Sequence, residues 1–102
     1  MKLITKEVAK KIPALYSQDG AGMDAIVHVK FFYPAGAATW YITELDPEEG
    51  LAFGWADLGH GGELGYVSIA ELEAFRGRFG LGIERDIHFT PRPLRECRGV
   101  DA

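Results

Sequence analysis

Two expected strands and the turn between them decide the fold, in residues 38–57, ATWYITELDPEEGLAFGWAD. Residues 46–50 form a turn, because Pro47 fixes φ, Asp46 caps the chain locally and Gly50 can adopt positive φ. The strand before the turn runs from about residue 38 to residue 45, and the strand after it covers residues 51–57. Alternation along the first strand predicts two opposite faces: Trp40, Ile42 and Glu44 on one, and Tyr41, Thr43 and Leu45 on the other.

The second of these strands has one face of large side chains and one of small ones. Leu51, Phe53, Trp55 and Asp57 alternate with alanines and a glycine, which leaves room for a helix to pack closely. Trp55 is therefore expected to be buried.

Further elements extend this hairpin in both directions. Alternating apolar residues predict strands at 25–33 and 63–69, and a fifth extended segment at 83–89. An N-terminal helix begins after Thr5 as N-cap and stops early or kinks at Pro13. A short helix opens at Ser68 with capping-box spacing and runs through Phe75.

Short strands joined by tight turns favour an antiparallel meander with helices on one face. We therefore predict a single α+β domain over residues 1–102. It has an antiparallel sheet of four or five strands, an N-terminal helix and a short helix after the fourth strand.

The composition excludes several classes of protein. With 102 residues, 47% hydrophobic, 25% charged and a net charge of −4, the chain does not have the composition of a disordered protein. No segment is long and apolar enough for a membrane span or a secretory signal. Cys97 is the single cysteine, so an intrachain disulfide is impossible and a reducing cytoplasm is the expected compartment.

Charge is distributed unevenly along the chain. Residues 31–75 contain no Lys or Arg and eight acids, whereas residues 1–30 and 76–102 each carry a balance of +2. This acid run predicts a candidate acidic surface for a basic partner. In the alternative, basic residues from both ends pair with the acids on a mixed surface. The candidate residues of the acidic surface are Glu44, Asp46, Glu48, Glu49, Asp57 and Glu63.

No residue pattern predicts a metal or a cofactor. His28, His60 and His88 are far apart, with no second ligand at metal-binding spacing. Residues 59–62, GHGG, lack the Lys-Ser/Thr of a phosphate loop and lead into a strand, so a hairpin loop is expected. Cys97 has no evident base to activate it.

Two alternative functions rest on smaller groups of residues. Paired carboxylates, Glu44 with Asp57 or Glu84 with Asp86, could bind Mg²⁺ or perform acid–base chemistry in a small enzyme. Nucleic-acid binding would need exposed rings beside a basic groove. The candidate residues for that surface are Trp40, Tyr41, Arg85, Arg92 and Arg95, with Trp55 and Tyr66 as further rings.

Several segments together resemble one protein family. They are IPALY (12–16), VKFF (29–32), WYITE (40–44), FGWAD (53–57), ELGYVSIAEL (63–72) and GIERDIHF (82–89). In this order they are similar to the domain-of-unknown-function family numbered 2958. The resemblance implies an accessory gene of a plasmid, phage or integrated element that acts in a bacterial cytoplasm, and it implies no biochemical activity.

These observations favour a non-enzymatic accessory protein of a mobile element that binds another protein. In its sharpest form, this hypothesis describes an anti-defence inhibitor whose acidic surface occupies the basic nucleic-acid site of a restriction or CRISPR-type effector. No membrane association is expected, and the oligomeric state is left open.

Overall fold

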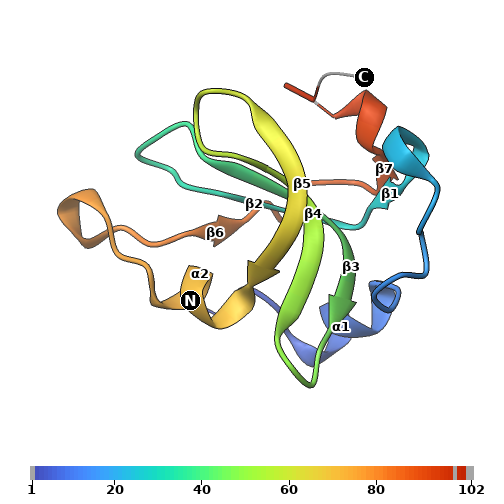
Figure 1. The fold of residues 1–102 in the computed structure, drawn as a ribbon. Helices are drawn as coiled ribbons and strands as arrows, with labels where there is room; N and C mark the ends of the chain where they lie inside the picture. Colours follow the sequence, from blue (N-terminus) through green and yellow to red (C-terminus); the bar gives the residue numbers. More distant parts are fainter. Residues whose placement is uncertain (1, 98, 101–102) are drawn as a thin grey trace.

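The computed structural model describes residues 2–97, 99 and 100, and its centre is a five-stranded antiparallel sheet (Figure 1). The strand order is β5-β4-β3-β2-β6, so consecutive strands are neighbours from β2 to β5. This meander confirms the expected α+β class. The strands are β2 (Val29–Phe32), β3 (Thr39–Asp46), β4 (Leu51–Asp57), β5 (Gly62–Ser68) and β6 (Glu84–Arg85).

Both predicted helices are present and begin where their capping residues indicate. Helix α1 covers Lys6–Lys11, and the Thr5 side chain accepts a hydrogen bond from the backbone N–H of Val8 at 3.2 Å. It ends before Pro13, as expected. Helix α2 covers Ile69–Ala74, with Ser68 Oγ accepting from the N–H of Glu71.

The strand predicted at residues 25–33 is divided at His28. The first part, β1 (Ile26–Val27), leaves the main sheet and pairs with β7 (Arg92–Pro93) in a separate two-stranded sheet. His28 itself donates its backbone N–H to the carbonyl of Ile42 at 2.9 Å. The C-terminal β7 was not predicted, because a two-residue segment that follows Pro91 and contains Pro93 carries no strand pattern.

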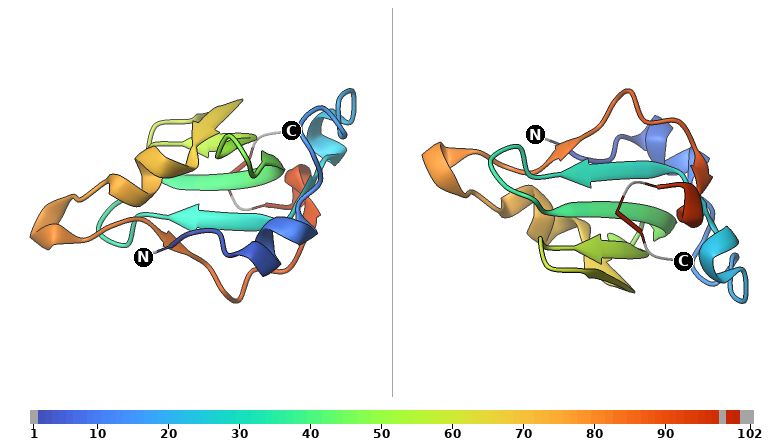
Figure 2. Two further views of the ribbon diagram at one scale, coloured as in Figure 1. Left: turned by 90° about the horizontal axis from the view of Figure 1, so that it is seen from below. Right: turned by 90° about the horizontal axis from the view of Figure 1, so that it is seen from above.

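Short 3₁₀ turns complete the fold: η1 (Gly22–Asp24), η2 (Arg78–Gly80) and η3 (Leu94–Glu96). The turns η1 and η3 lie beside β1 and β7 at one end of the molecule, whereas the loop that carries η2 projects from the other end (Figure 2).

A β-bulge in β3 corrects the predicted faces of that strand. Ile42 pairs with Gly54 and Glu44 pairs with Phe53, so Thr43 is the extra residue. Beyond the bulge the alternation is inverted. Leu45, not Glu44, therefore lies with Trp40 and Ile42 in the core.

Side chains on the two faces of the sheet form two apolar cores. The main core contains, among others, Leu3, Phe31, Trp40, Ile42 and Ile69. The second core, on the opposite face of β3 and β4, contains Ala25, Val27, Tyr41, Trp55, Leu94 and Cys97. The burial of Trp55 is thus confirmed.

Candidate functional site: an apolar groove

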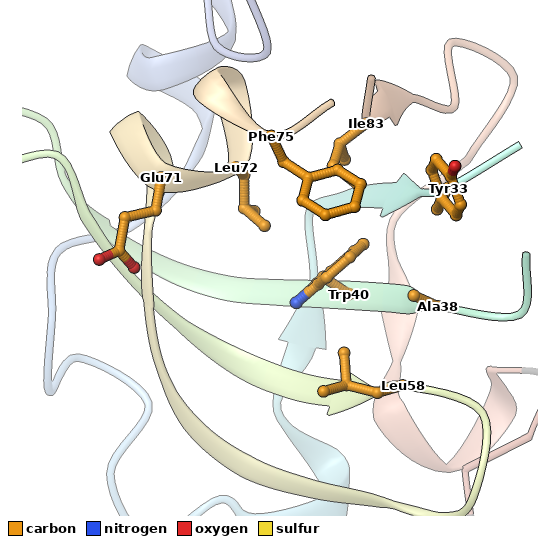
Figure 3. A pocket seen from close by; sticks show the side chains of 8 residues that line it. All are labelled: Tyr33, Ala38, Trp40, Leu58, Glu71, Leu72, Phe75 and Ile83. Atoms are coloured by element: carbon orange, nitrogen blue, oxygen red, sulfur yellow. The ribbon is translucent and has the colours of Figure 1, made fainter. Parts of the chain in front are cut away.

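An apolar groove opens at one corner of the main core, between α2 and the sheet (Figure 3). Its volume is about 310 Å³, within the range of small-ligand and side-chain pockets. The close-up shows Trp40 at the centre, between Phe75 on one side and Leu58 on the other. The groove is lined by Tyr33, Ala38, Trp40, Leu58, Glu71, Leu72, Phe75 and Ile83.

The aromatic wall of the groove is held in place by one tyrosine. The rings of Tyr33 and Phe75 meet edge to face, with their centroids 5.4 Å apart. The Tyr33 hydroxyl also accepts a hydrogen bond of 2.7 Å from the backbone N–H of Arg78. The chain passes so close to this hydroxyl at Gly77 that a Cβ atom there would collide with it. Any other residue at position 77 would displace the Tyr33 hydroxyl.

Phe79 lies at the tip of the loop that Tyr33 anchors. Its side chain is 92% exposed, the most exposed of the large hydrophobic residues described. Its φ of +59° is in the left-handed region, which is unfavourable for a residue with a Cβ. A strained backbone that presents an aromatic ring to solvent is more typical of a binding site than of a packing requirement.

The charged groups at the groove are sparse and local. Glu71 is the one acidic residue of the lining, and it is exposed. Arg76 Nη1 donates to the carbonyls of Glu73 and Phe75, at 2.8 and 2.7 Å, and so stays against its own helix end.

Glu44, predicted as part of an acidic surface, is buried instead. Only 4% of it is exposed, and its two carboxylate oxygens accept hydrogen bonds from the N–H groups of Tyr16 (2.8 Å) and Gln18 (2.9 Å). Tyr16 adopts a φ of +71°, a left-handed conformation at the first of these two donors. Glu44 therefore fixes a loop, and its inclusion in the exposed acidic surface was wrong.

The other five acids of that candidate surface fall into two groups at opposite ends of β4. Asp46, Glu48 and Glu49 lie in the β3–β4 turn, where Asp46 Oδ1 accepts from the N–H groups of the other two. Asp57 and Glu63 flank the β4–β5 loop, and Asp57 Oδ1 accepts from the N–H of Gly59 at 2.8 Å. Seven strand residues, about 20 Å, separate the two groups.

In the alternative, basic residues from both ends of the chain pair with the acids of residues 31–75, but the described ion pairs do not include these acids. In the described part of the chain, the ion pairs are Lys30–Asp86 at 3.9 Å and Arg95–Asp24 at 2.8 Å. Neither involves an acid of residues 31–75.

The candidate arginines for nucleic-acid binding are each engaged within the chain. Arg85 donates to the carbonyl of Leu3, Arg92 donates to Thr90 and lies over the Phe89 ring, and Arg95 pairs with Asp24. These contacts hold the three side chains against different parts of the chain: the N-terminal segment, the residues before β7, and η1.

The candidate rings are also unsuited to base stacking. Trp40 and Tyr41 are only 8% and 4% exposed and belong to different cores, so their assignment to an exposed stacking surface was wrong. Trp40 nevertheless lines the groove. Of the four rings considered, Tyr66 alone is exposed.

Glu44 and Asp57, one of the two carboxylate pairs considered for catalysis, are not brought together on β3 and β4. Glu44 lies opposite Phe53, whereas Asp57 lies opposite Thr39 at the far end of the ladder. Among residues 2–97, 99 and 100, no three His, Cys, Asp or Glu side chains are grouped as metal ligands. Burial lowers the pKa of His28 and raises that of the Cys97 thiol, which disfavours the nucleophilic thiolate.

Most of the groove was missed by sequence reasoning. The predicted elements place Tyr33 at the end of a strand and Phe75 at the end of a helix, and only the folded chain brings them together with Leu58. Phe79 offered a local signal, since an aromatic residue two positions after one glycine and directly before another has no amphipathic helix or strand to join.

Comparisons with known proteins place the chain in a family without assigning an activity. No curated protein and no solved structure matched it. Within the described residues, no helix has the length and apolar character needed to cross a membrane. A family model described as "Protein of unknown function (DUF2958)" matches residues 3–95, nearly the whole length. The chain therefore belongs to the DUF2958 family.

Proposed function

We propose that this chain is a non-enzymatic accessory protein that binds another protein through the groove and the adjacent Phe79. The observation that carries the proposal is the apolar groove, whose lining includes Leu58 and Phe75, which are 60% and 45% exposed. Phe79 is 92% exposed and follows Arg78, whose backbone N–H donates to the hydroxyl of Tyr33 in the lining. Large exposed apolar side chains gathered around a concave site are typical of protein-contact surfaces.

The chemistry of the groove indicates what the partner presents. A bulky apolar side chain would fill the space over Trp40, because that space is walled almost entirely by hydrocarbon. A Lys or Arg beside it would face Glu71, the acidic residue of the lining. We therefore propose a partner segment in which an apolar residue lies next to a basic one.

We further propose that the partner is a protein of the host cytoplasm, in keeping with the mobile-element setting that the family resemblance implies. A defence effector would fit this setting. The groove supports binding by apolar contact better than mimicry of nucleic acid, because the exposed acids are divided between the two ends of β4.

Selection from a random peptide library on the immobilised chain tests the proposal. We expect enriched peptides to share an apolar residue beside Lys or Arg. Their affinity should fall at least about tenfold, or 1.4 kcal/mol, in Phe79→Ser and in Leu58→Glu. Ile87→Ser is the matched control, because Ile87 is 71% exposed and does not line the groove. Peptides that bind all three variants equally well would overturn the proposal.

A further inference from the structure

The two edges of the main sheet are very different. At one edge, β6 is only two residues long, whereas β5 exposes a free edge along all seven of its residues (Figure 1). An edge strand presents unpaired N–H and C=O groups, which proteins usually protect with Pro, Lys or a bulge. Residues 62–68, GELGYVS, contain neither residue, and their register with β4 has no shift.

We propose that a second copy of this chain pairs with β5 in antiparallel fashion and extends the sheet across a two-fold axis at Gly65. With Gly65 opposite its own copy, Leu64 lies opposite Tyr66 of the second copy, and Tyr66 lies opposite the second copy's Leu64. Leu64 and Tyr66 are 42% and 54% exposed, so this pairing covers apolar surface on both copies.

The same register avoids repulsion between like charges. Glu63 is the single charged residue of β5, and in this pairing it faces Val67 of the second copy rather than a second Glu63. The strand is therefore complementary to itself around Gly65, which is the condition for a symmetric dimer.

The glycine at position 65 is explained by the proposed dimer, whereas the isolated chain gives no steric reason for a glycine there. A Cβ added there would meet no atom within 4 Å, and its φ is not left-handed. A glycine inside a strand weakens the strand unless another backbone approaches closely. At the two-fold axis, the backbone of the second copy would do so.

No residue of β5 lines the groove, so the proposed dimer and the proposed partner binding rest on different residues. Either proposal can therefore fail without the other.

Sedimentation equilibrium on the full chain, at about 0.15 M salt, tests the dimer. We expect wild-type protein to pass from 11.2 kDa towards twice that mass as its concentration rises. Gly65→Lys and Gly65→Glu should each weaken association at least about tenfold, because two like charges then meet at the axis. An equimolar mixture of the two variants should recover it through Lys–Glu pairs.

Two controls keep the test decisive. Ala70→Lys adds the same charge to exposed α2 and should leave the dimer unchanged. Hydrogen exchange of the wild type needs no substitution, and protection of β5 amides should rise with protein concentration. A wild-type protein that stays monomeric, or a mixture no tighter than either variant alone, would overturn the proposal.

Discussion

The two faces of the β3–β4 hairpin carry similar apolar side chains but are covered very differently. On the second core, segments from both ends of the chain close over Tyr41 and Trp55, and Glu44 fastens the loop at Tyr16 and Gln18. On the main core, α1 and α2 pack against the sheet (Figure 2), and the groove stays open beside α2 (Figure 3). One face therefore serves stability, whereas the open corner of the other is available for binding.

The largest expected effect is on the closed face. Trp55→Ala should lower the free energy of unfolding by about 3–5 kcal/mol, because it removes a large buried side chain and leaves a cavity. Leu58→Ala, at the open corner, should change it by less than about 0.5 kcal/mol, since that side chain is 60% exposed. Urea denaturation of both variants measures the contrast. Equal losses would contradict the assignment of the two faces.

A smaller effect on stability is expected to distinguish the buried Glu44 from the exposed acids of residues 31–75. Glu44→Ala should cost about 1.5–3 kcal/mol, because two backbone N–H groups lose a charged acceptor. Glu49→Ala should cost close to nothing, since its residue is exposed in the turn. Thermal unfolding of both variants checks this. A Glu44→Ala protein with the melting temperature of the wild type would show that these two hydrogen bonds do not stabilise the loop.

Local signals in the sequence were sufficient for much of the fold. Thr5 and Ser68 mark the helix starts because a cap acts within three residues of itself. The hairpin at residues 38–57 could be predicted because side-chain types alternate along its strands and because Asp, Pro and Gly favour a turn. These features depend on neighbours in the chain, so one sequence reveals them.

Features that depend on residues far apart in the sequence could not be predicted. The bulge at Thr43 has no local signature, yet it moved Glu44 off the face that it was predicted to share with Trp40 and Ile42. On the other face, the loop that carries Tyr16 and Gln18 covers Glu44 and buries it. The groove likewise depends on residues from β3, α2, the β2–β3 connection and the loop after β4, which only the fold brings together. Composition placed Glu44 on the acidic surface wrongly for the same reason, because charge counts carry no information about which end or face of a strand a residue occupies.

The smallest effect on stability, and a direct test of which acids attract a partner, comes from charge reversal at Glu71 of α2 and in the β3–β4 turn. Glu71→Lys, at the groove, should slow association with a selected basic peptide and weaken the complex. The double variant Glu48→Lys, Glu49→Lys should change the on-rate less, because neither side chain lines the groove. The turn does lie near the start of α2, where Gly50 accepts a hydrogen bond of 2.9 Å from the N–H of Ile69. Neither variant should shift the melting temperature appreciably, because exposed charges contribute little to folding. Stopped-flow binding at several salt concentrations distinguishes the cases. If the turn variant slows association as strongly as Glu71→Lys, the whole acid run steers the partner, and the groove is not the only electrostatic determinant.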